Sequence, residues 1–343
     1  MTRNTVYISC LLVFIVIIPS CSGSTSGNGK LHNTNSTIPT GLFMGIEPTE
    51  NPVLLFPDFI NTPMGEYNGT FNPEGTEFFY TVSNIWHNVI VSSRLQGDGS
   101  WSKPAKASFA VPYDEFDPLF SPDGQSLYFS SHRPFTEGGK KESSNIWRTS
   151  RTGDNSWSEP ELINLYGPRK GNYFSSLTKS GNIYFNIWNT GNMFKAIPVD
   201  TGYIVESLGD IINSNSGDGD PFIAPDESYL IFRSRREGGL GVGDLWVTFN
   251  LENGWTEPQN LGDPINSKYH EMCPYVTADG KLFIFSSGRF DKTYFHEDIE
   301  DLDDVKAKLG TWDNGQQNIY TMSASFIDSL RAEAVQQSKL KKG

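Results

Sequence analysis

About a third of the way along, the chain reads Ser121-Pro122-Asp123-Gly124, and the apolar run Leu127-Tyr128-Phe129 follows almost at once. Proline fixes φ for a turn and glycine accepts a positive φ, so the first four residues predict a tight hairpin turn. The run after the turn is apolar throughout, which is typical of a short strand that packs on both of its faces. This stretch therefore predicts one hairpin of a β-sheet.

The same kind of turn occurs five times along the chain, at intervals of about fifty residues. An apolar strand follows each turn, and a further strand that begins with Asn or Asp comes next. A unit of this length holds one four-stranded blade, so the repeat predicts an all-β protein with a single five-bladed β-propeller. The turns are Asn72-Pro73-Glu74-Gly75, Ser121-Pro122-Asp123-Gly124, Thr178-Lys179-Ser180-Gly181, Ala224-Pro225-Asp226-Glu227 and Thr277-Ala278-Asp279-Gly280.

The fifth unit lacks a fourth strand of its own. Residues 52–61, near the start of the predicted domain, resemble the fourth strands of other units, such as residues 208–213 and 261–266. We therefore expect residues 52–61 to pair with residues 318–323 and to close the ring, which removes the exposed sheet edge. Nothing interrupts the repeat, so residues 45–330 are predicted to form one domain.

These motifs resemble those of the PD40, or TolB-like, family of WD40-like β-propellers, and the resemblance covers residues 45–330. The shared pattern is Ser-Pro-Asp-Gly before an apolar strand, then Ser-x-Arg, a glycine-rich stretch and Asp-Leu-Trp, as at residues 244–246. The resemblance implies the propeller fold. It also implies a role in protein complexes, in the bacterial cell envelope or near polysaccharide breakdown, without choosing between them.

Residues 1–20 are predicted to be a signal peptide, because residues 6–18 are apolar but too few to span a bilayer. The sequence before Cys21 resembles a bacterial lipobox, in which Cys21 is lipidated; cleavage by ordinary signal peptidase is the alternative. Residues 21–44 are small and polar and predict a flexible, lipid-anchored linker. No acidic cluster follows Cys21, so we expect an outer-membrane lipoprotein that faces the periplasm and touches the membrane through this lipid only. Residues 331–343 are predicted to be a basic tail.

Charge and cysteine content exclude several classes of partner. A formal net charge of −13 leaves no basic surface for nucleic acid. Cys273 is the only cysteine after Cys21, so neither an intrachain disulfide nor a cysteine-based zinc site is predicted. No cofactor is predicted, although a divalent cation on a carboxylate-lined face stays open as an alternative. We expect a monomer.

Two repeat positions place charged side chains at one end of the blades. Counting back from the turn gives a polar residue every time, a carboxylate in four units and Asn172 in the third, and counting forward gives an arginine in three units. Three units combine the two, and we consider two interpretations: arginines that brace the inner strands, or arginines that bind an anionic ligand. The pairs are Glu115 with Arg133, Asp218 with Arg236 and Glu271 with Arg289.

Departures from the repeat are candidate site residues, because blade-building does not require them. Glu66 has the carboxylate position of the first unit, but Asn84 stands where an arginine would face it. At a neighbouring position, where two units carry Ser or Gly, the others carry larger side chains. These are His132, Trp188 and Arg235.

Three further features lie on the same face of the predicted propeller. His270 precedes the carboxylate Glu271, and Tyr67 follows Glu66. Residues 290–315 form a long insertion between two strands, and their acidic residues predict a short acidic helix. Long loops on a rigid scaffold commonly carry function.

The favoured hypothesis is an enzyme that acts on uronic-acid oligosaccharides by β-elimination, as a lyase or dehydratase. Guanidinium groups would neutralise the sugar carboxylate, and a histidine or tyrosine would move the proton. The predicted catalytic residues are His132 first, with His270, Tyr67 and Glu66 as further candidates. The predicted substrate-binding residues are Arg133, Arg235, Arg236, Arg289, Glu115, Asp218, Glu271 and Trp188.

Two other functions stay open. Hydrolysis could use two carboxylates drawn from Glu66, Glu115, Asp218 and Glu271, if a pair lies at the separation found in glycosidases. A non-catalytic TolB-like propeller that binds a protein or glycan in the cell envelope would also explain the tether and the repeat.

Overall fold

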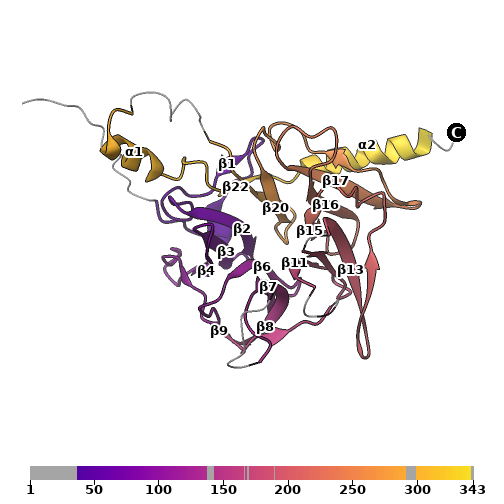
Figure 1. Cartoon of the computed structure of the whole chain (residues 1–343), viewed down its shortest axis with the longest axis horizontal. Coiled ribbons are helices and arrows are strands. Elements are labelled where there is room, and N and C mark those ends of the chain that lie inside the picture. The colour runs from indigo at the N-terminus through magenta and orange to yellow at the C-terminus, as the bar shows by residue number, and fades with distance from the viewer. Residues whose placement is uncertain are drawn as a thin grey trace, which may run out of the picture. The chain divides into compact units, whose positions relative to one another are not determined.

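The computed structural model describes residues 37–136, 143–165, 167, 170–188, 190–290 and 299–340. The chain from residue 36 onward forms a single compact unit. Its strands make five antiparallel sheets around a central axis, with the first strand of each sheet innermost (Figure 1). The predicted five-bladed β-propeller is confirmed.

Every blade carries four strands in up-and-down order, and blades 2 and 4 add a short fifth strand. Blade 1 comprises β2 (Gly65–Phe71), β3 (Glu77–Ser83), β4 (Asn88–Arg94) and β5 (Ala105–Lys106). Blade 2 comprises β6 (Glu115–Phe120), β7 (Ser126–Ser131), β8 (Asn145–Gly153), β9 (Ser156–Trp157) and β10 (Glu161–Leu162). Blade 3 comprises β11 (Asn172–Leu177), β12 (Ile183–Ile187), β13 (Asn192–Val199) and β14 (Gly202–Ser207).

The last two blades follow the same plan. Blade 4 comprises β15 (Gly219–Ile223), β16 (Tyr229–Ser234), β17 (Asp244–Leu251), β18 (Gly254–Trp255) and β19 (Gln259–Asn260). Blade 5 comprises β20 (Glu271–Val276), β21 (Leu282–Ser287), β22 (Asn318–Ser323) and β1 (Val53–Leu54). The second strands supply the core between blades, as the fully buried Phe129, Phe185 and Phe232 show.

The ring closes as predicted. β1 pairs with β22 in antiparallel register, with Val53 opposite Thr321. The pairing is shorter than residues 52–61, because the chain turns at Phe56 and Asp58, both of which have a positive φ.

Asn61, just past this turn, fastens the closing segment to blade 5. Its Oδ1 accepts from Ile319 N at 2.7 Å, and its Nδ2 donates to Ile319 O at 3.1 Å. Two other blades repeat the same clamp, which explains why residues 52–61 resemble their fourth strands. These clamps join Asn213 to Met193 and Asn266 to Leu245.

We expect Asn61→Ala to lower the free energy of unfolding by about 1–3 kcal/mol, because the buried N–H of Ile319 loses its acceptor, whereas Ile319 O keeps the hydrogen bond from Leu55 N. Chemical denaturation measures the change, and Asn253→Ala, at an exposed turn, is the control. An Asn61→Ala protein as stable as the wild type would contradict closure through this clamp.

A β-bulge recurs in the first strand of every blade. One residue at each bulge has a φ between 49° and 55°. These residues are Asn68, Asp117, Phe174, Asp220 and Cys273. At four bulges a polar side chain from the second strand of the preceding blade accepts from the backbone N–H, which links the inner strands into a ring. The acceptors are Thr81, Ser130, Asn186 and Ser286, at 2.9–3.1 Å.

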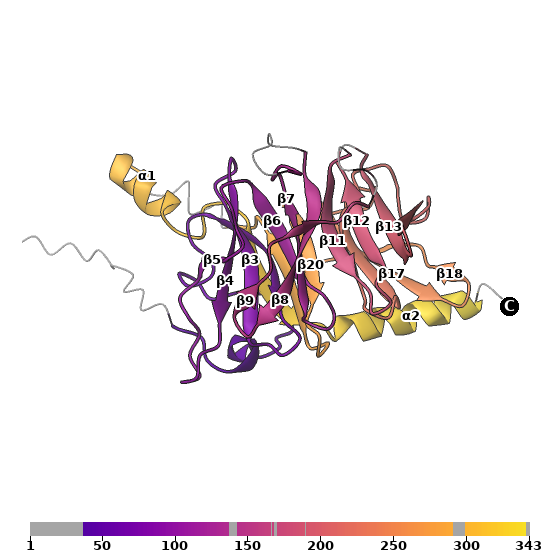
Figure 2. The same cartoon turned by 90° about the horizontal axis from the view of Figure 1, so that it is seen from below.

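The two faces of the propeller differ. We call the face with the loops between second and third strands the loop face, and the face with the repeated turns the hairpin face. In Figure 2 the loop face is at the top, and α2 (Phe326–Leu340) runs along the hairpin face below. α1 (Leu302–Leu309) is the acidic helix predicted in the insertion 290–315, and Asp301 caps it.

The ends of the ordered unit differ from the predicted boundaries. The C-terminal segment is helical up to Leu340 rather than a tail from residue 331, because α2 packs beside β17 and buries Ile327 and Ala334. At the other end η1 (Leu42–Gly45) already buries Met44, so order begins before residue 45.

The predicted signal peptide and lipidation site at Cys21 lie outside the described residues. Among the residues that the structure describes, no helix is both long and apolar enough to cross a membrane.

Candidate functional site

The three arginine–carboxylate pairs are hydrogen-bonded inside their blades. Each carboxylate is buried, and each guanidinium also lies over an aromatic ring of its own blade. The bonds run from Arg133 Nε to Glu115 Oε1 at 3.0 Å, from Arg236 Nη2 to Asp218 Oδ1 at 2.9 Å and from Arg289 Nη2 to Glu271 Oε1 at 3.4 Å. This geometry matches the bracing interpretation, so we leave these residues out of the candidate site. It also argues against hydrolysis by these carboxylates.

Glu66 is fully buried as well, and no arginine of the described residues pairs with it. Thr62 N donates to its carboxylate at 3.0 Å, and the Thr62 hydroxyl donates to the other oxygen. Asn84 turns away, because its Oδ1 accepts from His87 N at 2.8 Å. Burial raises the pKa of Glu66 to about 8. The group is therefore protonated at neutral pH and out of reach of a ligand.

The stability of the fold should depend on pH through Glu66. Folded Glu66 keeps its proton up to about pH 8, whereas the unfolded chain releases it near pH 4.5. The free energy of unfolding should therefore decrease as the pH rises from about 4.5 to about 8. Each unit by which the pKa of Glu66 differs between the folded and the unfolded state corresponds to about 1.4 kcal/mol of stability.

Glu66→Gln cannot ionise, so it should be more stable than the wild type at about pH 8 and should lose less stability as the pH rises. Denaturation at a series of pH values measures this, with Glu50→Gln as an exposed control. If wild type and Glu66→Gln show the same pH dependence, the assignment is wrong.

Blade 4 departs from a cross-strand pattern that the other blades share beside the axis. Just before each bulge, the first strand places a large side chain opposite a smaller polar one on the second strand. In blade 4 the sizes are exchanged, so that Gly219 faces Arg233. The other pairs are Tyr67 with Thr81, Phe116 with Ser130, Tyr173 with Asn186 and Met272 with Ser286.

Gly219 makes room for the guanidinium of Arg233. A Cβ atom at position 219 would lie 2.6 Å from Arg233 Nη2, closer than such atoms approach. Arg233 Nε donates to Asp220 Oδ2 at 3.1 Å, and Nη1 donates to Gly217 O at 3.0 Å. Among the described residues, none accepts a hydrogen bond from Nη2. Arg233 therefore keeps a donor for an anion beside the axis.

His270 lies next to Arg233. Both side chains pack on Gly243, where an added Cβ would lie 2.8 Å from His270 Cδ2 and 3.5 Å from Arg233 Cδ. Burial, followed by the charges of Arg233 and of the exposed Arg235, lowers the pKa of His270. The imidazole is therefore neutral at neutral pH, and it lies beside two guanidinium groups.

Aromatic side chains connect this cluster to His132. Burial raises the pKa of the Tyr173 hydroxyl group, and the positive charge of Arg233 acts on this group and opposes the rise. The ring of Tyr173 lies 5.5 Å from the ring of Trp188. Trp188, Phe116 and His132 line a cavity of about 280 Å³ on the loop face, and the rings of Phe116 and His132 are 5.9 Å apart. We call this surface, from His132 through Trp188 and Tyr173 to Arg233, Arg235 and His270, the axial site.

The structure thus separates residues that the sequence grouped. His132 lies at the aromatic end of the axial site, and its neighbour Arg133 turns into the blade toward Glu115. His270 and Arg235 lie at the cationic end beside Arg233, which was not among the predicted site residues. Arg233 could have been recognised from the repeat, because the other blades carry Thr, Ser or Asn at the equivalent position.

The tyrosines at the axis stay protonated at neutral pH, so they are not bases there. Burial raises the pKa of both Tyr67 and Tyr173, and the nearby carboxylates raise it further. Burial and the charge of Asp220 also raise the pKa of Asp117 well above its usual range. Tyr67 itself donates to Asn88 Oδ1 at 3.1 Å.

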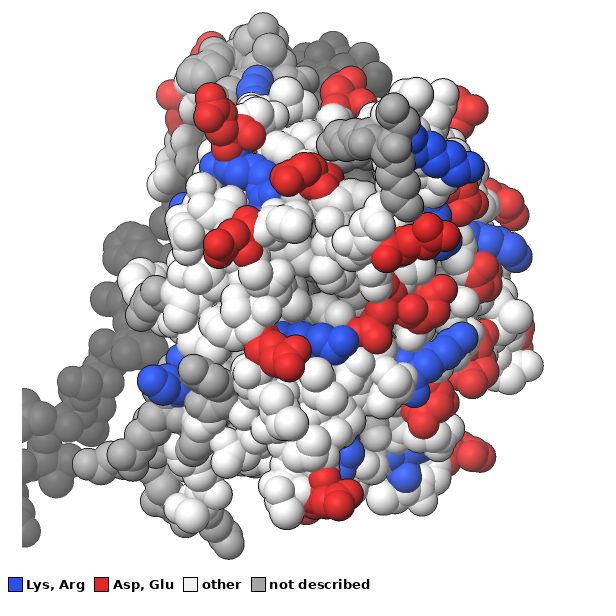
Figure 3. Space-filling view, turned by 90° about the vertical axis from the view of Figure 1, so that its right-hand side faces the viewer, with Lys and Arg blue, Asp and Glu red and all other residues white. Residues whose placement is uncertain are grey.

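A divalent cation finds no ready site in the described parts of the chain, since no three His, Cys, Asp or Glu side chains gather there. On the side that Figure 3 shows, acidic and basic side chains lie interspersed, without a continuous basic surface.

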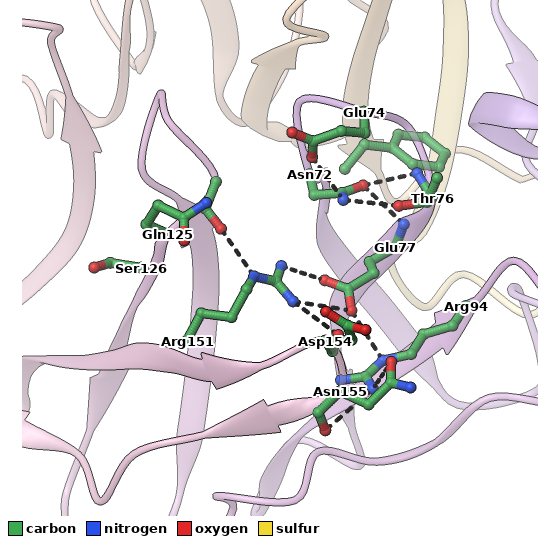
Figure 4. Close-up of polar contacts among 12 residues, drawn as sticks. Asn72, Glu74, Thr76, Glu77, Arg94, Gln125, Ser126, Arg151, Asp154 and Asn155 are labelled. Atoms are coloured by element: carbon green, nitrogen blue, oxygen red, sulfur yellow. Dashed lines mark hydrogen bonds and ion pairs between the residues drawn. The ribbon is translucent and has the colours of Figure 1, made fainter.

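A second arginine cluster lies on the hairpin face, between blades 1 and 2. Arg94 and Arg151 flank the buried Glu77 beside a cavity of about 310 Å³ (Figure 4). Arg94 Nε lies 3.1 Å from Glu77 Oε1, and Arg151 Nη2 lies 2.7 Å from Glu77 Oε2. Because both guanidinium groups are paired with one carboxylate, this cluster joins two blades and is a weaker candidate for an anion site.

No family model matches the sequence, and no curated protein is significantly similar to it. Solved structures with a similar fold include a GH43 endo-arabinanase from Bacillus licheniformis, with 13% identity over 81% of this chain and 96% of that chain and a TM-score of 0.48. Another is TolB from Acinetobacter baumannii, with 20% identity over 59% of this chain and a TM-score of 0.39; the match spans 44% of that chain. The five-bladed fold is established by this chain's own strand pairing.

Proposed function

We propose that the axial site binds an acidic oligosaccharide and removes a proton next to a uronate carboxylate. Arg233 and Arg235 hold the carboxylate, and His270 accepts the proton. One observation carries the proposal: the exchange of Gly219 and Arg233 places a guanidinium with an open Nη2 beside a neutral imidazole.

The reaction is a β-elimination. Neutralising the uronate carboxylate makes the neighbouring C–H bond more acidic, and the imidazole of His270 takes that proton. The released electron pair forms a C=C bond while the bond from the β-carbon to the glycosidic oxygen breaks. Tyr173, which is protonated at neutral pH, donates a proton to the leaving oxygen. Solvent then carries the proton from His270 back to Tyr173.

Two neighbours support these groups. Asp220 is a positioning residue, because its Oδ2 accepts from Arg233 Nε at 3.1 Å and so fixes the guanidinium. Trp188 is 58% exposed and offers a flat face to a neighbouring sugar ring. We place this activity in the cell envelope, with the chain anchored through Cys21.

Non-catalytic glycan binding is the second candidate. The cavity that Trp188 and His132 line is favourable for it, since an exposed indole can stack on a sugar without any proton transfer. The two candidates differ only in whether the bound sugar is cleaved.

A panel of acidic sugars tests both candidates. Homo-oligomers of galacturonate, glucuronate, mannuronate and guluronate are incubated with the protein, and the ultraviolet absorbance of the unsaturated product and the product masses are recorded. Calorimetry on the same panel measures binding. Cleavage of at least one oligomer to an unsaturated product is expected; binding without cleavage favours the second candidate, and neither binding nor cleavage overturns the proposal.

A further inference from the structure

We infer a distal sugar subsite at Ile85-Trp86, in the loop between β3 and β4 on the loop face. The inference rests on the proposed function, and it extends the axial site from blade 4 across to blade 1. Its ligand is a sugar ring at the far end of a long acidic oligosaccharide.

Trp86 is the side chain that points to this subsite. It is 88% exposed, and Ile85 beside it is 72% exposed. Ile85 has a φ of 77°, a conformation that is costly for a β-branched residue and is often found where function requires it. The backbone is therefore strained at Ile85, and the indole of Trp86 beside it is exposed to solvent.

The loop is held in place by its own polar groups. Ser83 Oγ accepts from Ile85 N at 3.0 Å, and Asn84 Oδ1 accepts from Trp86 N at 3.1 Å. A large aromatic side chain on a fixed turn loses little conformational entropy when it binds a ligand.

The loop adjoins the aromatic end of the axial site. His87 Nδ1 lies 3.0 Å from Asp114 Oδ1, and Asp114 O accepts from His132 N at 3.0 Å. Asp114 thus connects the residue after Trp86 to the residue that lines the Trp188 cavity. An oligosaccharide held at Arg233 and passing over Trp188 would run toward Trp86.

The size of the apolar surface favours a sugar over a protein partner. A stable protein interface buries roughly 1,200 Å² or more, whereas one indole presents a face that matches a single sugar ring. Ser83, Asn84 and His87 flank Trp86 in the same loop, and polar side chains of these kinds can hydrogen-bond to sugar hydroxyl groups. The expected ligand is therefore one ring of a longer chain.

The test compares short and long ligands. Calorimetry measures the affinity of the wild type, Trp86→Ala and Ile204→Ala for dimers and hexamers of the four uronates of the panel. Ile204 is exposed on the outer strand β14 and serves as the matched control. We expect Trp86→Ala to weaken hexamer binding about tenfold, with dimer binding unchanged, whereas Ile204→Ala should bind both as the wild type does.

The outcomes separate this inference from the proposed function. Equal hexamer affinity of Trp86→Ala and the wild type overturns the distal subsite and leaves the proposed function standing. Failure of the wild type to bind any dimer or hexamer overturns the proposed function, and the subsite with it. Equal loss in Trp86→Ala for dimers and hexamers also overturns the inference, because it places Trp86 in the same subsite as Arg233.

Discussion

Replacing His270 by glutamine is expected to lower kcat for cleavage of an acidic oligosaccharide by about 10²–10⁴, the usual contribution of a general base. Binding should change little, because Arg233 and Arg235 supply the charge that holds the carboxylate. The rate is measured from the absorbance of the unsaturated product, and the affinity by calorimetry.

His132→Gln is the matched control for His270→Gln. His132 lies at the aromatic end of the axial site, so its loss should affect KM more than kcat. The pH profile gives a second readout: the burial and positive charges that lower the pKa of His270 should keep the wild type active below the pH at which an ordinary imidazole is half protonated. If His270→Gln keeps the wild-type kcat, the base lies elsewhere.

Replacing Arg233 by alanine is expected to weaken binding of an acidic oligosaccharide about 10–100-fold, the value of a charge-assisted hydrogen bond. The same variant leaves the buried Asp220 without its ion pair, so some loss of stability should accompany the loss of binding. Calorimetry under conditions in which the variant is fully folded separates the two effects.

Arg236→Ala distinguishes a bracing arginine from a ligand-binding one. It removes the ion pair of the buried Asp218, which keeps its hydrogen bonds from Ser214 and Ser234, so it should lower stability by about 1–3 kcal/mol while the affinity for the oligosaccharide stays unchanged. Loss of affinity in Arg236→Ala with unchanged stability would reverse these two assignments.

The fold could be read from the sequence because its signals are local. A turn such as Ser121–Gly124 is recognised by its proline and glycine, and the strand after it by a short run of apolar residues. Ring closure was also predictable, since Asn61 repeats the clamp of Asn213 and Asn266. The C-terminal helix was missed because only two of its residues, Ile327 and Ala334, are buried, so it has no broad apolar face to mark it in the sequence.

The candidate site could be located only in part. The repeat placed His132, Arg235 and His270 on one face, and it also suggested that Arg236 could be a brace. It could not show which arginine keeps a free donor, because Asp218 and Asp220 are two residues apart and their partners depend on the direction of each side chain. The bulge at Asp220 decides that direction, and a bulge carries no signal that one sequence reveals.

The exchange of Gly219 and Arg233 illustrates the same limit. Each residue alone looks ordinary, since glycine is common in this chain and Arg233 directly follows the apolar run of residues 230–232. Their meaning appears only when the two strands are paired and Gly219 is found opposite Arg233. Register across strands, rather than position along the chain, is what identifies the site.

The most direct test compares each uronate oligomer of the panel with its methyl ester, which removes the carboxylate charge and keeps the sugar. Binding of both forms to the wild type and to Arg233→Ala is measured by calorimetry, and the double difference isolates the contact between Arg233 and the carboxylate. The wild type should prefer the acid form by about tenfold or more, and Arg233→Ala should lose most of that preference. An unchanged preference in Arg233→Ala would contradict carboxylate recognition by Arg233.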